Sequence, residues 1–312
     1  MNKIKKTGNL EQIACTKRIE YKSGKANGVN AILCRNESLS LTLLESMALD
    51  IFDLSYAGKN MSFISKNGLV SRNLSNSNGY DFAKYFGGGF LYTCGLDNIG
   101  NSNDNKPVHG SFASIPAQIL KEQIIIESDK YILEIEGKIC DSSLFNKEIE
   151  VIRNYKIYSS KIILTDIITN LGYSDQDIIM LYHFNIGYPM LDSGTRFNAN
   201  VNSTVGRTDN CDMKKYNSMN EPADDCFEEV FIHTIEEDLA TIVVENSELK
   251  QKIRFSYNTE FLKYLMEWKS MQSGAYALGI EPATSHLDKK QFITLTSGKT
   301  LENQVSIEFF LS

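Results

Sequence analysis

The chain has 312 residues, of which 42% are hydrophobic and 23% charged, a balance typical of a soluble globular protein with a large core. Its formal net charge of −7 repels a phosphate backbone, which argues against nucleic acid as a main partner. No segment approaches the roughly 20 apolar residues of a membrane span. The basic N-terminal residues are not followed by the apolar run of a signal peptide, so we expect a cytoplasmic protein that has no membrane partner.

The first third of the chain is rich in turn residues. Asn, Ser and Gly are frequent in residues 67–80 and 97–107, which we interpret as long loops. Between them, Asp81–Phe86 is predicted to form a short helix that ends at Gly87. The triplet at residues 87–89 is all glycine and carries no dinucleotide fingerprint, which favours close packing of chains below a sheet edge.

Strand patterns dominate the rest of the chain. In residues 131–139, Leu133 and Ile135 alternate with Glu134 and Glu136, which is the period of a strand. A hairpin turn is predicted at residues 127–130. Further strands are predicted at 149–158, 161–169, 178–185, 229–234, 240–245, 251–257, 276–281, 291–295 and 304–311.

Helical patterns are few in the same region. Glu260–Leu265 fits either a helix or a strand, and residues 202–227 are polar and acidic, which indicates a third long loop. Without a strand–helix rhythm, many short strands predict an all-β fold, a large antiparallel β-sandwich. We expect one domain over residues 1–312, in which the long loops border a site rather than separate domains.

Metal and disulfide chemistry find no support in the spacing of residues. The six cysteines contain no C-x-x-C pair, and no His, Cys and Asp cluster has zinc-ligand spacing. The acidic loop also lacks the EF-hand pattern. We therefore expect reduced thiols, no metal and no cofactor.

Four histidines are the candidate acids and bases near neutral pH. His233 and His286 fit structural or surface positions. His109 precedes Gly110, which permits a close backbone approach or a positive φ. His183 shares one face of a predicted strand with Asn185, and this polar face fits a cavity wall and a solvent-exposed surface equally well.

One glutamate stands at the end of an apolar strand. Glu281 follows Ala277–Ile280, and Pro282 stops the strand immediately after it. Partial burial there would raise the pKa of the carboxyl toward the range of a general base. A strand-end glutamate that points into solvent fits the pattern equally well.

Four runs, taken in order, resemble a known superfamily. They are GGGFLYTCGLDNIG (87–100), HGSFASIPA (109–117), YHFNIGYPMLDSG (182–194) and YALGIEPAT (276–284). The chain resembles the galactose mutarotase-like superfamily over nearly its whole length, and within it a DUF4432-like bacterial branch related to aldose 1-epimerases. This resemblance implies a supersandwich of antiparallel sheets with few short helices and a sugar cleft on one face.

The resemblance also implies catalytic roles. Two histidines and one glutamate are expected at the reacting carbon, and they correspond to His109, His183 and Glu281. Glu281 would take the proton from the anomeric hydroxyl O1, and His183 would protonate the ring oxygen O5. His109 would hydrogen-bond the same region and steady the developing charge. No cofactor is implied.

Sugar-binding residues follow with less support from pattern. Asp97 and Asn98 precede His109 and match the hydrogen-bonding of vicinal hydroxyls, and Asp192 corresponds to a hydroxyl-binding aspartate of the family. Candidate sugar contacts further include Asn185, the lone tryptophan Trp268 and the loop residue Arg72. For Trp268 and Arg72, positions in the core and on the surface respectively are the alternatives.

Three functions remain open at this point. The first is an aldose 1-epimerase that interconverts the α and β anomers of a sugar. The second is another sugar isomerase or epimerase that uses the same residues, and the third is a non-catalytic carbohydrate-binding protein. The segment around His183 departs from that of well-studied galactose mutarotases, which leaves the sugar unidentified. The oligomeric state is open as well, with a homodimer among the options.

Overall fold

The computed structural model describes residues 3–72, 82–102, 106–127, 130–145 and 147–311, with side chains from residue 5 onward. Parts of the predicted loops (73–80 and 103–105), the helix residue Asp81 and the hairpin residues 128–129 lie outside the described residues. Among the described residues, no helix is long and apolar enough to cross a membrane.

Three antiparallel sheets make up the fold, as the alternating pattern predicted. The first sheet consists, in spatial order, of β1 (Cys15–Glu20), β2 (Asn30–Arg35), β3 (Leu39–Leu44), β4 (Asp50–Tyr56) and β5 (Lys59–Asn60). The second consists of β12 (Thr195–Ala199), β15 (Leu239–Asn246), β16 (Gln251–Asn258), β20 (Thr300–Leu311), β10 (Lys161–Asn170), β9 (Glu148–Ile157), β8 (Lys130–Ser142) and β7 (Gln118–Glu127).

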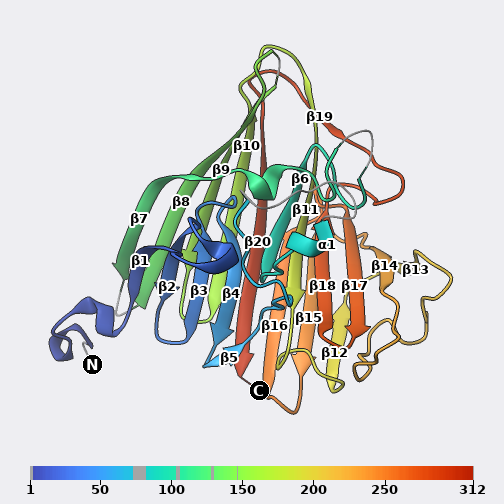
Figure 1. Cartoon of the computed structure of the whole chain (residues 1–312), viewed down its shortest axis with the longest axis horizontal. Coiled ribbons are helices and arrows are strands. Elements are labelled where there is room, and N and C mark those ends of the chain that lie inside the picture. The colour runs from blue at the N-terminus through green and yellow to red at the C-terminus, as the bar shows by residue number, and fades with distance from the viewer. Residues whose placement is uncertain (1–2, 73–81, 103–105, 128–129, 146, 312) are drawn as a thin grey trace.

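The third sheet carries the candidate functional site. Its order is β13 (Ser203–Gly206), β14 (Glu229–Thr234), β17 (Tyr264–Gln272), β18 (Ala275–Ala283), β11 (Gln176–Ile186) and β19 (Ile293–Leu295). Strand β6 (Leu91–Leu96) also pairs with β11. In Figure 1 the first and third sheets lie side by side and overlie the second sheet, so the molecule is a two-layered sandwich.

Helices are few and short. The one α-helix of the described residues is α1 (Phe82–Tyr85), and 3₁₀ turns occur at Lys3–Lys6, Leu10–Gln12, Gly24–Ala26 and Phe112–Ser114. The ambiguous segment Glu260–Leu265 is not helical, because a turn leads directly into β17, which pairs with β18 along its whole length. The predicted loop at 202–227 also contains one short strand, β13.

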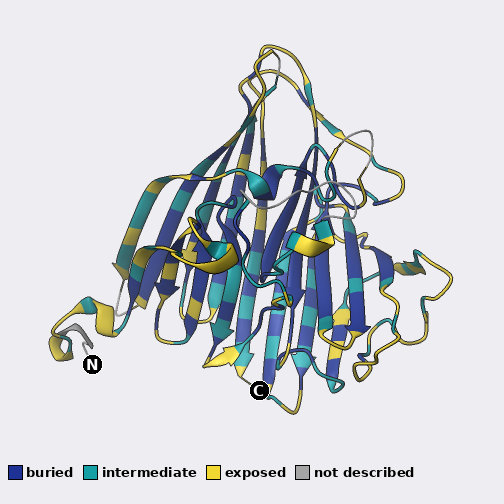
Figure 2. Ribbon diagram, in the orientation of Figure 1, coloured by how far each residue is buried: buried dark blue, intermediate teal, exposed yellow. Residues whose placement is uncertain are grey.

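One hydrophobic core lies between the layers. It draws apolar side chains from all three sheets, including Leu41 of β3, Leu133 of β8 and Phe184 of β11. Figure 2 shows this alternation as dark blue bands along the strands, with exposed residues concentrated in the turns and edge loops. Burial of alternate side chains fixes which face of each strand is left for the site.

A buried ionic network joins the layers next to the site. The guanidinium of Arg153 in β9 donates to Asp50 of β4 at 2.8 Å and to both carboxylate oxygens of Asp166 in β10 at 2.8 and 2.7 Å. The Tyr182 hydroxyl donates to Asp166 at 2.8 Å. Because Tyr182 immediately precedes His183, this network fixes the position of β11 relative to the second sheet.

The glycine triplet acts as the sequence predicted. A Cβ on Gly87 would lie 2.5 Å from the Gly68 carbonyl oxygen, and one on Gly88 would lie 2.6 Å from that of Phe63. Both distances are shorter than real Cβ contacts, so the two chain segments can approach this closely only because the residues are glycines.

Candidate active site

The outer face of the third sheet carries the candidate catalytic residues. Tyr182 and Phe184 of β11 point into the main core, and Leu181 points to the opposite face, where a second apolar cluster lies. The alternation of side chains along β11 places His183 on the same outer face as Leu181. The sequence predicted this division of β11 into two faces.

Strand register brings His183 and Glu281 together. Leu181 pairs with Ala283 and Phe184 with Ile280, and the same register sets His183 opposite Glu281. Nε2 of His183 lies 3.0 Å from Oε1 of Glu281. Both residues are buried, with side-chain exposures of 9% and 5%.

Gly279 leaves the space that this pair occupies. A Cβ at Gly279 would lie 2.8 Å from Oε1 of Glu281, 2.9 Å from Cε1 of His183 and 3.1 Å from Cβ of Trp268. The first two distances are shorter than real Cβ contacts. A glycine at this strand position is therefore needed for the pair to form.

His109 reaches the same place from a loop. Its backbone has a φ of 62° and is held by hydrogen bonds from its N–H to the Gly100 carbonyl at 2.8 Å and from the Gly95 N–H to its own carbonyl at 3.0 Å. The next residue, Gly110, has a φ of 79°, and a Cβ there would lie 2.4 Å from the Gly95 oxygen. The Pro-Val-His-Gly sequence thus produces a tight turn that aims the His109 ring at the sheet.

Ring contacts connect these side chains. The His109 and His183 rings lie 5.8 Å apart between centroids, nearly edge to face, and the His183 and Trp268 rings lie 5.5 Å apart. Phe82 of α1 lies 5.1 Å from the His109 ring on the other side. The two histidines therefore stand in a row between aromatic side chains.

A cleft of about 750 Å³ opens over this row. His109, His183, Glu281 and Trp268 all line it. Its remaining side chains are largely apolar, with a few charged groups, and include Phe63, Phe82, Phe86, Phe227, Lys66, Arg207 and Glu228. A concave, mostly apolar cleft with a few convergent polar groups is the usual form of a small-molecule site.

Burial determines which member of the His183–Glu281 pair carries the proton. It raises the pKa of Glu281 to about 8, with a further increase from the negative charge of Glu228 and a decrease from Arg207. Burial also holds the pKa of His183 well below its usual value, and His109 adds to this while the Asn185 side chain opposes it. The pKa of His109 is lowered to about 4 by burial and then by the charge of Lys290. At neutral pH the site thus favours neutral histidines and a protonated Glu281.

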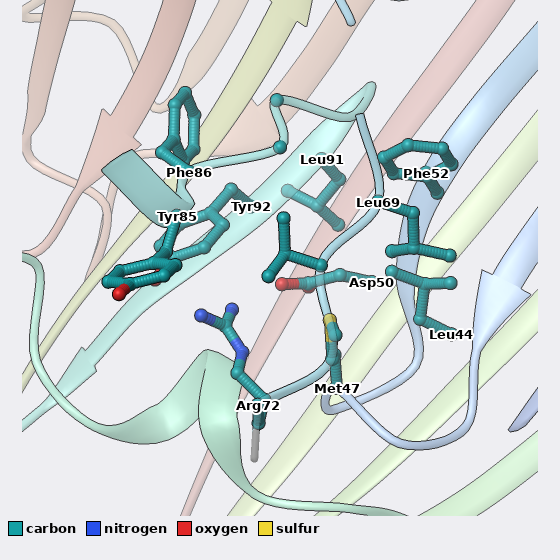
Figure 3. Close-up of a pocket in the computed structure, with 13 residues that line it drawn as sticks. Leu44, Met47, Asp50, Phe52, Leu69, Arg72, Tyr85, Phe86, Leu91 and Tyr92 are labelled. Atoms are coloured by element: carbon teal, nitrogen blue, oxygen red, sulfur yellow. The ribbon is translucent and has the colours of Figure 1, made fainter. Parts of the chain in front are cut away.

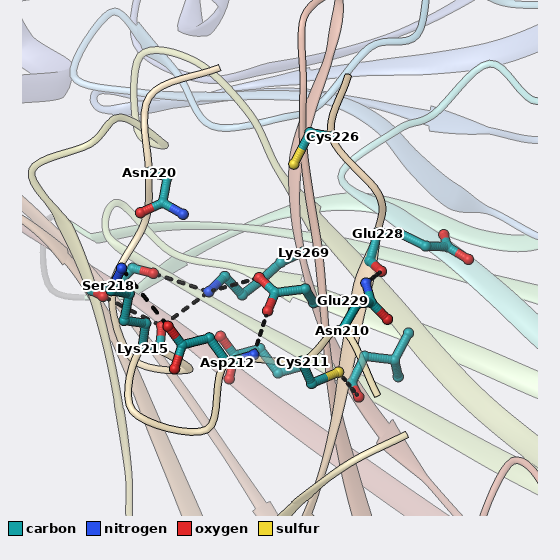
Figure 4. A network of polar contacts seen from close by, with 12 residues as sticks. Asn210, Cys211, Asp212, Lys215, Ser218, Asn220, Cys226, Glu228, Glu229 and Lys269 are labelled. Atoms are coloured by element: carbon teal, nitrogen blue, oxygen red, sulfur yellow. Dashed lines mark hydrogen bonds and ion pairs between the residues drawn. The ribbon is translucent and has the colours of Figure 1, made fainter. Parts of the chain in front are cut away.

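A long loop between β13 and β14 forms one wall of the cleft. It supplies Arg207, which pairs with Asp288 at 2.7 Å, and Glu228, which accepts a 2.8 Å hydrogen bond from Nε1 of Trp268. The loop is held from below by the buried ammonium of Lys269, which donates to the carbonyls of Lys215 and Ser218 at 3.0 Å each (Figure 4). Trp268 and Lys269 are neighbours on β17, so one strand both lines the cleft and anchors its wall.

Two predicted sugar ligands lie behind the His109 turn instead of in the cleft wall. Asp97 accepts from the Ser111 N–H at 3.0 Å. The buried Asn98 amide donates to the carbonyls of Asn101 and Pro107, and its oxygen accepts from Lys290. Both side chains brace the turn that presents His109, and neither lines the cleft.

Two further predicted ligands also lie outside the cleft wall. Asn185 is buried and donates to the carbonyls of Gly89 and His183 at 3.0 and 3.1 Å. The Asp192 carboxylate accepts from the N–H of the adjacent Ser193, within a turn after β11. Asn185 therefore supports the strand that carries His183, whereas Asp192 belongs to the turn that follows that strand.

Arg72 lines a different and much smaller cavity of about 20 Å³. Its guanidinium stands 5.5 Å from the centre of the Tyr92 ring, on the side where Asp50 and Tyr85 also lie (Figure 3). This space is about the size of one water molecule. Of the nine predicted site residues, His109, His183, Glu281 and Trp268 share the cleft, and Arg72 lies beside another cavity.

Sequence reasoning missed the charged and aromatic residues of the loop wall. Arg207, Phe227 and Glu228 lie in or just after a polar segment that has no periodicity, so no pattern marked them. Phe227 is 81% exposed although it lines the cleft, and an exposed aromatic residue in a polar loop is a signal that the sequence does contain. Within the described parts of the chain, no group of three or more His, Cys, Asp or Glu side chains could hold a metal ion.

Comparison with known proteins places this geometry in context. A family described as "Domain of unknown function (DUF4432)" matches residues 26–302. No curated protein sequence matches the chain.

Solved structures resemble the chain over nearly its whole length. A "putative aldose 1-epimerase" from Klebsiella pneumoniae subsp. pneumoniae MGH 78578 is 20% identical, with a TM-score of 0.84 over 96% of this chain and 88% of that one. A galactose mutarotase-like protein from Clostridium acetobutylicum is 14% identical, with a TM-score of 0.69 over 96% of this chain and 100% of that one. Galactose 1-epimerase from Lactobacillus acidophilus NCFM is 10% identical, with a TM-score of 0.64 over 95% and 99%. At these identities the likeness shows a common fold, which is the fold that the sequence predicted.

Proposed function

The chain belongs to the DUF4432 family, whose function is unknown, and from this premise and the galactose mutarotase-like fold we propose that it is an aldose 1-epimerase. The reaction would interconvert the α and β anomers of an aldose or a modified sugar. One observation carries the proposal: a buried His–Glu pair in 3.0 Å contact lines a cleft of about 750 Å³ with a second histidine beside it.

The chemistry needs one acid and one base at the same time. In ring opening, a base removes the proton from O1, the C1–O1 double bond forms, and the C1–O5 bond breaks while an acid protonates O5. Rotation about C1–C2 and closure with the roles reversed give the other anomer. General acid–base catalysis of this kind requires the two groups within hydrogen-bond reach of the sugar.

Glu281 and His183 can serve as the base and the acid while sharing a single proton. Burial favours a resting form with that proton on Glu281. Transfer across the 3.0 Å contact gives a carboxylate and an imidazolium, the base and acid that the reaction needs. We assign Glu281 as the base at O1, His183 as the acid at O5 and His109 as a neutral hydrogen-bonding group beside them.

The sugar would lie between aromatic side chains. Trp268, Phe227 and Phe82 line the cleft, and the Trp268 indole N–H donates a hydrogen bond to Glu228, which lines the same wall. A carboxylate beside an aromatic face suits a pyranose, which has hydroxyls at its edge and C–H groups on its faces. This assigns hydroxyl binding to Glu228, which lines the cleft, in place of the predicted polar ligands that do not.

The experiment is exchange NMR on the anomeric protons of a panel of sugars, such as glucose, galactose, xylose, fucose and glucose 6-phosphate. We expect the protein to accelerate exchange between the anomers of at least one sugar, and the Glu281→Gln variant to lose that acceleration. Deuterium incorporation at C2 in D₂O would instead indicate the alternative isomerase. Binding of a sugar without accelerated exchange would indicate the carbohydrate-binding alternative.

A further inference from the structure

A buried thiol contacts His109 on the side away from the cleft. Sγ of Cys94 lies 3.3 Å from Nδ1 of His109. Cys94 is a free cysteine on β6 with no exposed surface, and it does not line the cleft, whereas His109 does. The thiol therefore occupies one ring nitrogen of His109, and the described residues form no hydrogen bond with the other, Nε2.

Both groups are neutral near pH 7. Burial raises the pKa of the Cys94 thiol, and the negative charges of Glu281 and Asp50 raise it further. The pKa of His109 is lowered to about 4 by burial and then by Lys290. The two side chains together therefore carry two protons, one on the sulfur and one on the imidazole ring. The ring proton can be on Nδ1 or on Nε2.

Two arrangements satisfy this proton count. In the first, the S–H donates to Nδ1, and the ring proton sits on Nε2. In the second, Nδ1–H donates to sulfur, and the S–H must find another acceptor. Among the described residues, the other hydrogen-bond partner of Sγ is the Tyr92 carbonyl, at 3.9 Å. Sulfur is a weak acceptor, whereas the lone pair of an imidazole nitrogen is a good one, so the first arrangement is favoured.

We propose that Cys94 is a positioning residue that holds His109 in the tautomer with its proton on Nε2. His109 then donates a hydrogen bond into the cleft and does not accept a proton there. A donor beside the His183–Glu281 pair would stabilise negative charge on a sugar oxygen as the ring opens or closes. This last consequence rests on the proposed function, and the tautomer itself does not.

NMR of the ring nitrogens tests the tautomer without a substrate. The chain has only four histidines, so protein labelled with ¹⁵N in the histidine rings gives a simple long-range ¹H–¹⁵N spectrum, and a His109→Asn sample assigns the His109 signals. We expect wild-type His109 to show an unprotonated Nδ1 and a protonated Nε2 at pH 7. A protonated Nδ1 in the wild-type protein would overturn the proposal.

Variants connect the tautomer to the thiol. Cys94→Ser retains a donor and is expected to keep the wild-type nitrogen shifts, whereas Cys94→Ala is expected to move Nδ1 toward the protonated position. Cys34→Ala is the matched control, because Cys34 is another buried free thiol whose Sγ lies 4.0 Å from the carbonyl two residues before it. His109 shifts in Cys94→Ala that equal those of the wild type and of Cys34→Ala would refute the role of Cys94.

An activity measurement separates this proposal from the proposed function. If exchange of sugar anomers is accelerated, Cys94→Ala should lower kcat/KM by roughly 2- to 10-fold, as expected for loss of one weak hydrogen bond, and Cys94→Ser should restore most of it. If no sugar is turned over but the nitrogen shifts are as expected, the tautomer assignment stands and the proposed function fails.

Discussion

The third sheet carries two buried histidine–glutamate pairs, and the nitrogen-to-oxygen distance is almost the same in both. Nε2 of His183 is 3.0 Å from Glu281, and Nε2 of His233 is 3.1 Å from Glu267. In both pairs burial is the largest cause of the shifts, lowering the pKa of the histidine and raising that of the glutamate. Distance and pKa therefore do not distinguish the two pairs.

The surroundings of the two pairs do distinguish them. His233 is enclosed: its Nδ1 pairs with the Thr204 hydroxyl at 2.9 Å, its ring stacks on Phe197 at 5.3 Å, and the side chains of the pair have no exposed surface. His183 and Glu281 line the cleft and keep some exposure.

The alternation of side chains along β17 explains the separation. Trp268 faces the cleft, and Glu267 and Lys269, one residue to either side, point to the opposite face. The enclosed pair, His233–Glu267, thus supports the sheet. The open pair, His183–Glu281, is accessible from the cleft and available for chemistry. The comparison teaches that access from the cleft, and not distance or pKa, separates the proposed catalytic pair from the enclosed one.

The largest expected difference between the two pairs comes from replacing the glutamate of each. Glu281→Gln should lower the rate of anomer exchange by about 10²- to 10⁴-fold, because it removes the group that exchanges protons with the sugar. Glu267→Gln should leave the rate within about threefold, because that pair does not meet the cleft. Exchange NMR on both variants measures this, and equal losses in the two would contradict the distinction.

The next effect comes from the space at Gly279. Gly279→Ala should reduce activity by about 10²-fold, because the added carbon displaces Glu281 or His183 from the contact. Gly194→Ala is the control, since a Cβ there lies no closer than 3.7 Å to any neighbour. A Gly279→Ala protein with wild-type kcat/KM would show that the close contact of the pair is not required.

pH should act on the open pair through Glu281. The reaction needs one proton on the pair, so kcat/KM should fall by about tenfold per pH unit above the pKa of Glu281, which is about 8. Glu267→Gln should retain this profile. A profile that stays flat to pH 10 would mean that Glu281 does not carry the working proton.

The same shift affects stability. The folded-state pKa of Glu281 is raised from 4.5 to about 8, so its contribution to stability is fully present below pH 4.5 and is lost as the pH rises through 8. The wild-type protein should therefore lose stability relative to Glu281→Gln between pH 5 and 9, by an amount on the order of a few kcal/mol. Urea unfolding at both pH values measures the difference, and a gap that does not change with pH would contradict the assignment.

The smallest effects concern sugar binding. Glu228→Gln should raise KM by about 2- to 10-fold, because it weakens a hydrogen bond to a sugar hydroxyl. It should also move the basic limb of the pH profile to lower pH, since the Glu228 charge raises the pKa of Glu281. Asp192→Asn, outside the cleft wall, should change KM by less than about twofold. A larger rise in KM for Asp192→Asn than for Glu228→Gln would indicate that Asp192, and not Glu228, binds the sugar hydroxyl.

The sequence predicted the fold well because the information is local. Period-two alternation in segments such as 131–139 marks strands, and Gly110 marks a turn. The prediction that Pro282 stops its strand is wrong, because β18 continues to Ala283, and Pro282 lies within it opposite Leu265. The faces of β11 also followed from alternation, with Tyr182 inward and His183 outward. The segment Glu260–Leu265 was ambiguous because its helical pattern is local and its pairing with β18 is not.

The site was only partly predictable, for a related reason. His109, His183 and Glu281 fall in recognisable runs, but the 3.0 Å contact depends on the register between β11 and β18 and on the space at Gly279. Asp97 and Asn98 are polar residues next to His109, and only the three-dimensional turn shows that they face its backbone. Arg207, Phe227 and Glu228 reach the cleft through an irregular loop whose path no periodicity encodes.

The most direct test of the central claim compares wild-type protein, Glu281→Gln and Glu267→Gln in one anomeric exchange NMR measurement over the sugar panel. We predict accelerated exchange of at least one aldose by the wild-type and Glu267→Gln proteins, and no acceleration of that aldose by Glu281→Gln. Exchange that is accelerated equally by all three proteins, or by none of them for any sugar, would contradict the account.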